Sequence, residues 1–154
     1  MPSLAAVVER ELALVERFLA MLLEEQAALR RGAVDGLEAF TAAKAERASR
    51  RNAASDEREA WLASEGAAAG RSGLEAWLAA HPEDQAAGKA WRKLIAVAEA
   101  SRDANRLNGQ LIAQRLQFTH QALVVLAGET PAAGLYDRDG QSTRGTGSRI
   151  IDAA

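Results

Sequence analysis

Residues 3–31 read SLAAVVERELALVERFLAMLLEEQAALRR, and this stretch decides the fold. Its apolar residues recur with alternating four- and three-residue spacing, which is typical of the seam of a coiled coil. Ser3 has the side chain of a helix N-cap, and Gly32 follows two arginines where a helix would end. The pattern predicts one long helix whose seam contains Val8, Leu12, Val15, Leu19, Leu22, Gln26 and Leu29.

Three further helices are predicted after this one. We expect them at about residues 34–64, 72–80 and 83–127. No segment alternates apolar and polar residues for long enough to build a sheet. We therefore expect an all-α protein: an elongated antiparallel helical bundle with coiled-coil packing over residues 1–128. Residues 129–154 are rich in glycine and poor in large apolar side chains, which indicates an irregular, flexible tail.

The composition excludes several classes of protein. The formal net charge is only -2, so no large basic field is available to bind nucleic acid. The chain has no cysteine, which excludes disulfides and thiolate chemistry and fits a reducing compartment. Neither a secretory signal pattern nor an apolar run of about 20 residues is present. We expect a soluble, cytoplasmic protein that does not insert into membranes.

Candidate chemical sites are few. His81 and His120 lie far apart, and neither has a second histidine at metal-ligand spacing. The carboxylates fall on helical faces that we expect to be wet, where acid-base catalysis is not favoured. We predict no metal site, no cofactor and no catalytic residue, so an enzyme is the most distant of the alternatives.

Two groups of residues are interpreted as structural. Acidic residues interleave with a run of basic ones, so we interpret that run as a solvated helix face and not as an anion site. The tryptophans are interpreted as one core cluster at the glycine-rich end of the bundle, although exposed tryptophans would mark a binding site. The residues concerned are Lys44, Arg47, Arg50, Arg51 and Arg58 in the basic run, and Trp61, Trp77 and Trp91 in the cluster.

The last predicted helix carries a broad apolar arc. At about 100° per residue, its large side chains form two neighbouring rows, with polar residues opposite. One row contains Leu107, Leu111, Phe118, Ala122 and Val125, and the other contains Ile112, Leu116, Leu123 and Leu126. Because the arc covers nearly half of the helix, one neighbouring helix cannot cover it. We expect part of this surface to bind a partner.

The last third of the chain carries an ordered series of short motifs. Trp91 is followed by RDANRLNG at 102–109, QALVVL at 121–126 and LYDRDGQ at 135–141. In their order and spacing these motifs resemble the FlgN family. There an asparagine and an Asn-Gly pair precede an amphipathic helix, and a Leu-Tyr-x-x-Asp-Gly-Gln segment follows. The resemblance covers about residues 91–149.

The resemblance implies a flagellar type III export chaperone without an active site. Such a protein binds the C-terminal helical segments of the hook-filament junction proteins FlgK and FlgL in the cytoplasm. On the last helix, we predict that clients are bound by Leu111, Ile112, Leu116, Phe118, Leu123 and Leu126. The alternative at each position is that its row only packs the bundle.

The asparagine motif of the family has a structural interpretation here. Amide side chains such as Asn105 and Asn108 can bond across a bundle or to the backbone of a client. Gly109 can permit the close approach of another helix. We predict structural roles for all three residues.

The resemblance further implies that the tail docks at the export gate component FlhA. The predicted docking residues are Leu135, Tyr136, Asp139 and Gly140. Tyr136 is the most specific of them, because no core requirement explains an aromatic residue in a glycine-flanked tail. The alternative is that Leu135 and Tyr136 fold back and cap the bundle. For the whole protein, the second hypothesis is a generic coiled-coil adaptor or oligomerisation module, which leaves the tail motif unexplained.

Overall fold

The computed structural model describes residues 1–33 and 35–128, and every regular element in this part of the chain is a helix. The helices are α1 (Leu4–Arg31), α2 (Leu37–Ser64), α3 (Gly70–Ala80) and α4 (Gln85–Leu126). The predicted all-α class is confirmed. The chain divides into two compact units, residues 1–112 and the residues from 113 onward, and α4 contributes to both. The tail expected from residue 129 lies outside the described residues and stays a prediction.

Local sequence explains where α1 begins and ends. The Ser3 side chain accepts a hydrogen bond from the backbone N–H of Ala6 at 3.2 Å, as an N-cap does. Gly32 ends the helix in the left-handed conformation with φ 75°, a conformation that costs glycine little. Gly36 is also left-handed, with φ 90°, and α2 therefore begins at Leu37, later than predicted.

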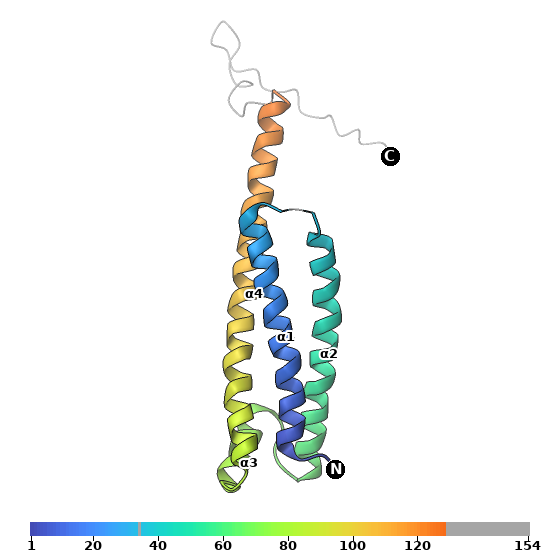
Figure 1. Ribbon diagram of the computed structural model, residues 1–154, viewed down its shortest axis with the longest axis vertical. Coiled ribbons are helices and arrows are strands. Elements are labelled where there is room, and N and C mark those ends of the chain that lie inside the picture. Colours follow the sequence, from blue (N-terminus) through green and yellow to red (C-terminus); the bar gives the residue numbers. More distant parts are fainter. Residues whose placement is uncertain (34, 129–154) are drawn as a thin grey trace, which may run out of the picture. The chain divides into compact units, whose positions relative to one another are not determined.

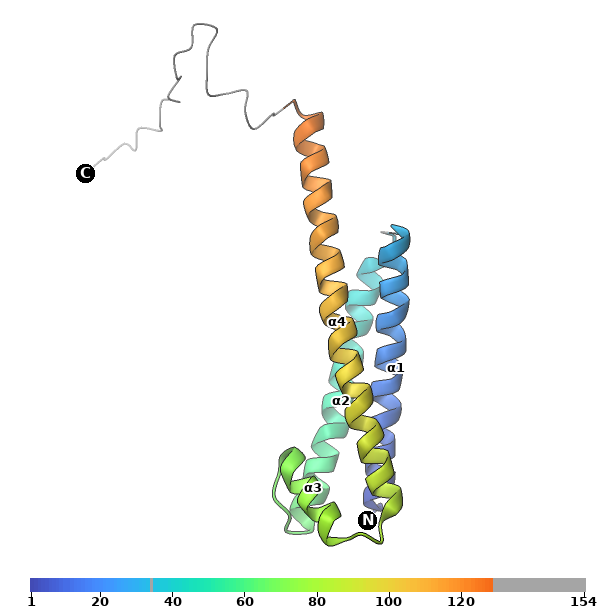
Figure 2. The same ribbon diagram turned by 90° about the vertical axis from the view of Figure 1, so that its left-hand side faces the viewer.

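Within residues 1–112, α1 packs against both of the other long helices. Ion pairs join Arg10 to Glu57 near one end of α1 and Glu25 to Lys44 near the other, so α1 and α2 are antiparallel. Figure 1 shows these two helices running in opposite directions, and Figure 2 shows the first part of α4 running in the same direction as α1. The predicted antiparallel packing of the first two long helices is therefore correct.

The predicted seam of α1 lies in the core. Among its members, Leu19 and Gln26 are half-buried, and the others are buried: Val8, Leu12, Val15, Leu22 and Leu29. One core cluster joins the first half of α1 to residues of α2, α3 and α4. A smaller cluster around Leu22 joins the second half of α1 to α2 and α4. The seam is thus covered on both sides along most of its length.

The three tryptophans gather at one end of this bundle, as predicted. Trp61 is buried, and its Nε1 donates a hydrogen bond to the Pro2 carbonyl at 3.0 Å. The ring of Trp77 meets the Trp61 ring edge-on, with centroids 5.1 Å apart. Trp91 is buried in the same core cluster. Aromatic pairs in this geometry stabilise a core by more than their buried area alone.

Glycine is required at one position beside the tryptophans. A Cβ atom at Gly73 of α3 would collide with the backbone carbonyl of Ala68. Because that neighbour is backbone and not the end of a flexible side chain, it cannot move aside cheaply. Gly73 therefore lets α3 pack closely against the turn that precedes it.

Two groups of buried charged residues contradict the prediction that the acidic residues and the basic run lie on solvent-exposed helix faces. Arg58, predicted to lie on a solvated face, is buried, and its Nε donates to the Glu11 carboxylate at 2.8 Å. The Arg58 guanidinium also lies 5.2 Å from the centre of the Trp91 ring. Glu11 and Glu25 are both buried carboxylates, so the expectation of exposed acids was wrong for them. The reason is that their partners lie far away in the sequence.

The second of these groups connects all three long helices. Glu25 of α1 accepts from Lys44 of α2 at 2.7 Å and from the Asn108 amide of α4 at 2.8 Å. The same amide donates to the Leu22 carbonyl at 2.8 Å. Removing one partner from a buried charge pair typically costs about 3–5 kcal/mol, whereas a slip in register would separate all three groups. We infer that this cluster fixes the register of the helices.

Candidate functional site

The candidate site is the apolar face of α4 beyond residue 112. Four of the predicted client-binding side chains are largely exposed there: Leu116 (66%), Phe118 (71%), Leu123 (59%) and Leu126 (83%). Val125 belongs to the same arc and is 73% exposed. Exposed apolar side chains that gather on one face usually mark a surface with a partner. This face is therefore the strongest candidate for a binding site among the described residues.

The two remaining client-binding candidates have different surroundings. Leu111 and Ile112 are half-buried and belong to the unit formed by residues 1–112. The six predicted residues thus divide into a half-buried pair and an exposed group of four. Both rows of the arc are represented in the exposed group. The alternative in which one row only packs the bundle finds no support at these four positions.

Helical spacing arranges the exposed side chains along the two rows of the arc. Leu116 and Leu123 lie seven residues apart, and so do Phe118 and Val125, which places each pair on one side of the arc. From Leu116 to Leu126 the helix rises by about 15 Å. The face therefore has the length needed to contact about three turns of another helix.

Sequence reasoning missed one charged residue within this arc. At about 100° per residue, Arg115 falls between the two apolar rows, and its side chain is half-buried. Among the described residues, no carboxylate forms an ion pair with it. The position of Arg115 around the helix could have revealed it, but only the apolar residues of the arc were taken as candidates. Val125 was likewise placed in a row but not among the six candidates.

The asparagine motif divides into one structural residue and two exposed ones. Asn108 is fully buried and bonds across the bundle, which confirms its predicted structural role. Asn105 is exposed. The predicted close approach of a helix at Gly109 is wrong, because a Cβ atom there would meet nothing within 4 Å. A local motif cannot reveal which of its residues faces a neighbouring helix.

The predicted docking residues for the export gate lie outside the described residues. They are Leu135, Tyr136, Asp139 and Gly140. Their role, and the alternative in which Leu135 and Tyr136 cap the bundle, therefore stay predictions.

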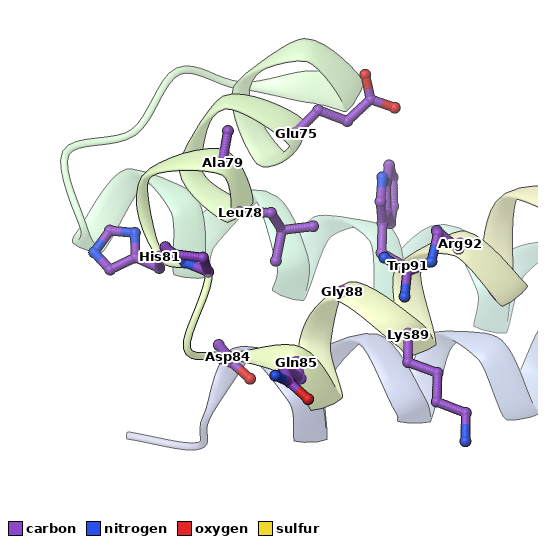
Figure 3. Close-up of a pocket in the computed structure, with 11 residues that line it drawn as sticks. Glu75, Leu78, Ala79, His81, Asp84, Gln85, Gly88, Lys89, Trp91 and Arg92 are labelled. Carbon is purple, nitrogen blue, oxygen red and sulfur yellow. The ribbon is translucent and has the colours of Figure 1, made fainter.

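A cavity of about 590 Å³ lies at the junction of α3 and α4 (Figure 3). Its two carboxylates already serve the fold: Asp84 caps the first turn of α4 at 3.1 Å, and Glu75 pairs with Arg71 at 2.8 Å. His81 stacks on the ring of Trp77. Figure 3 shows Glu75 and Asp84 on opposite sides of the cavity. The two carboxylates that line the cavity therefore lie apart, and each already has a partner within the fold.

Within residues 1–33 and 35–128, no group of three histidine or acidic side chains is placed to hold a metal ion. In the same ranges, no helix combines the length and the apolar character that crossing a bilayer requires.

Comparison with known protein families identifies the family of this chain. The sequence model of the FlgN protein family matches residues 1–144. The chain belongs to the FlgN family. This is a family of flagellar export chaperones and not of enzymes, so the protein acts in flagellum assembly and export. The match includes α1, α2 and α3, and thus extends well beyond the motifs of the last third. No curated protein and no solved structure is similar enough to match.

Proposed function

We propose that this FlgN-family protein binds the hook-filament junction proteins FlgK and FlgL in the cytoplasm and delivers them to the export gate through FlhA. The observation that supports the proposal is the exposed apolar face of α4, which a client can cover. The proposed client-binding residues are Leu111, Ile112, Leu116, Phe118, Leu123 and Leu126.

The expected mode of binding is amphipathic client helices laid against this face, one along each apolar row, because one helix cannot cover the whole arc. Before assembly, an amphipathic terminal helix of a client has no partner for its apolar stripe, and covering that stripe prevents self-association. Fully burying one large apolar side chain contributes about 1.5–3 kcal/mol, so four of them contribute roughly 6–12 kcal/mol. Association itself costs about 4–15 kcal/mol. The two contributions are of similar size, so we expect binding that is reversible, as a chaperone that releases its client requires.

Arg115 adds a possible source of selectivity to the apolar face. A cation between two apolar rows favours a client helix with a carboxylate beside its apolar stripe, because pairing compensates both charges for lost hydration. We therefore expect Arg115→Leu to weaken the binding of such a client, while binding of a purely apolar helix is kept.

The client-binding proposal is tested with the double variant Leu116→Glu/Leu123→Glu. Two charges in the face should weaken the binding of a FlgK C-terminal peptide by roughly a hundredfold or more, because each would be buried without a partner. Isothermal titration calorimetry measures the affinity. Leu23→Glu is the matched control, since Leu23 is a half-exposed leucine on α1. Unchanged affinity in the double variant would remove this face from the client site.

The gate-docking proposal is tested by measuring FlhA binding instead of client binding. The ring of Tyr136 can enter a pocket while its hydroxyl bonds a polar partner, and a tethered tail engages the gate without releasing the client. We expect Tyr136→Ala to lose FlhA binding in a pull-down while client binding by calorimetry is kept. Tyr136→Phe separates the contribution of the ring from that of the hydroxyl. Normal FlhA binding by a stable Tyr136→Ala protein would rule out this docking role.

A coiled-coil adaptor or oligomerisation module would use the same face differently. In that case α4 would pair with a second copy of the chain, and the apolar rows would be covered without a client. Light scattering after size exclusion distinguishes the two functions. A dimer that Leu116→Glu/Leu123→Glu converts to a monomer, combined with no affinity for FlgK or FlgL peptides, would support the adaptor.

A further inference from the structure

A second cavity, of about 510 Å³, lies within residues 1–112 between α2 and α4. Phe18 of α1 is the aromatic residue that lines it. Ala45 and Ala48 line it from α2, and Ala98 and Ser101 line it from α4. Side chains this small on two facing helices leave room for a third backbone to approach closely. The cavity is separate from the six proposed client-binding residues.

The structure separates the members of the basic run that the sequence places on α2. Four of the five have a partner: Lys44 pairs with Glu25, Arg47 donates to the Arg17 carbonyl, Arg50 pairs with Glu46, and Arg58 pairs with Glu11. Arg51 has no acidic partner among the described residues. Its guanidinium lies 5.9 Å from the centre of the Phe18 ring, at the cavity. Arg47 likewise forms no ion pair with a described carboxylate, but it does not line the cavity, so Arg51 is the member of the run that offers an unpaired charge there.

A second unpaired arginine lines the cavity from the opposite helix. Arg102 of α4 is exposed and forms no ion pair with any described carboxylate. No described carboxylate side chain lines the cavity. A ligand there meets arginines on both walls and an aromatic ring, so it should be negatively charged at its edges and apolar in the middle.

The shape of the cavity favours a helix over a small anion. Its walls run from Lys44 to Arg51 and from Ala98 to Asn105, which corresponds to about two helical turns, or roughly 10 Å. Phosphate sites usually use free backbone N–H groups at helix N-termini. Both walls here are helix interiors, whose N–H groups already bond within the helix. An amphipathic helix, by contrast, supplies an apolar stripe and acidic edges together.

We propose that this groove is a second docking site, which binds an acidic amphipathic helix of a partner protein. The apolar stripe of that helix covers Phe18, and carboxylates along its two edges pair with Arg51 and Arg102. The small side chains of both walls admit its backbone. The site does not depend on the client-binding role of α4, because its residues and its charge requirement are different.

The experiment uses two synthetic helical peptides with the same leucine stripe. Glutamates flank the stripe in one peptide and lysines flank it in the other, and fluorescence anisotropy measures their binding to the full chain. We expect the glutamate peptide to bind roughly tenfold more tightly or better, and Arg51→Glu/Arg102→Glu to weaken it by about tenfold or more. Circular dichroism checks that the variant folds; if it does not, Arg51→Gln/Arg102→Gln replaces it.

A matched control separates local pairing from long-range attraction. Arg50→Glu/Arg106→Glu changes the same two helices by the same total charge, but these arginines pair with Glu46 and Asp103 and do not line the cavity. It should weaken binding clearly less than Arg51→Glu/Arg102→Glu does, because these side chains form no direct pair with the peptide and exposed charges act on it only weakly through solvent and salt. An equal loss in both double variants would overturn the proposal. So would equal binding of both peptides, or a loss confined to Leu116→Glu/Leu123→Glu, which would place the peptide on the α4 face.

Discussion

The seam of α1 and the last turns of α4 carry similar leucine patterns but have opposite surroundings. Leu22 of the seam is 0% exposed, whereas Leu123 is 59% exposed, although each lies in an apolar row on an amphipathic helix. The difference shows that periodicity identifies the apolar side of a helix and says nothing about what covers it. The apolar side chains of the α1 seam are buried against the other helices of the same chain. In α4, beyond residue 112, the described part of the chain leaves the leucines exposed.

The two regions also differ in their polar contacts. The seam is accompanied by Glu11 and Glu25, which are buried and bonded to groups on other helices. Such contacts tie α1 to particular neighbours. Beyond residue 112, the one cation within the apolar arc, Arg115, has no carboxylate partner among the described residues. Exposed leucines beside a charge without a described partner are what the proposed reversible binding of a client would use.

The largest expected effect contrasts a leucine from each region. Leu22→Ala should lower the free energy of unfolding by about 2–5 kcal/mol, because it leaves a cavity in the core. Leu123→Ala should change it by about 0.5 kcal/mol or less, because the side chain is already in water. Urea unfolding followed by circular dichroism measures both. Similar losses in the two variants would show that the α4 leucine is buried in the free protein.

The next prediction concerns the close packing of α3 against the turn that precedes it. Gly73→Ala should destabilise the protein by about 3 kcal/mol, since the new Cβ atom collides with the Ala68 carbonyl and forces the backbone to shift. Thermal unfolding should show a lower midpoint than the wild type. Gly73→Ala with a wild-type midpoint would mean that α3 does not lie against that turn.

A smaller effect distinguishes two asparagines on the same helix. Asn108→Ala should cost about 1–3 kcal/mol, because it removes a buried donor from Glu25 and the Leu22 carbonyl. Asn105→Ala is the matched control; its side chain is exposed, and we expect almost no change. Hydrogen exchange at the neighbouring amides of α1 and α4 should rise only in the first variant. Equal exchange in both would argue against the cluster that fixes helix register.

The smallest effect has the opposite sign. Gly109→Ala should stabilise the protein by about 0.5–1 kcal/mol, because alanine is the better helix former and its Cβ atom meets open space. The midpoint of chemical unfolding should therefore rise slightly. A loss of stability would indicate a close neighbour at Gly109, as the asparagine motif first suggested.

Much of the fold was predictable because its signals are local. The cap at Ser3, the end of α1 at Gly32 and the apolar seam all follow from residues a few positions apart. The buried acids were not predictable in this way. Arg58 and its partner Glu11 are 47 residues apart, and each looks like an ordinary surface charge within its own helix. Only a partner from another helix makes their burial possible.

The candidate site was predicted less completely. The sequence identified the arc on the last helix and six of its side chains, but it could not separate Leu111 and Ile112 from the exposed group. It also passed over Arg115, which lies between the rows. These distinctions depend on how far the other helices extend along α4, and helix length and packing are not encoded in the pattern of α4 alone.

The sequence by itself determined the helices, the apolar side of each helix and, through the ordered motifs of the last third, the resemblance to the FlgN family. Only the tertiary structure decided which apolar residues remain in water and which charges are buried. It also decided which two arginines stay unpaired beside the groove between α2 and α4. The physical reason is range: helix formation and amphipathicity depend on residues three or four apart. Burial and charge pairing depend instead on distant segments that meet only when the chain folds.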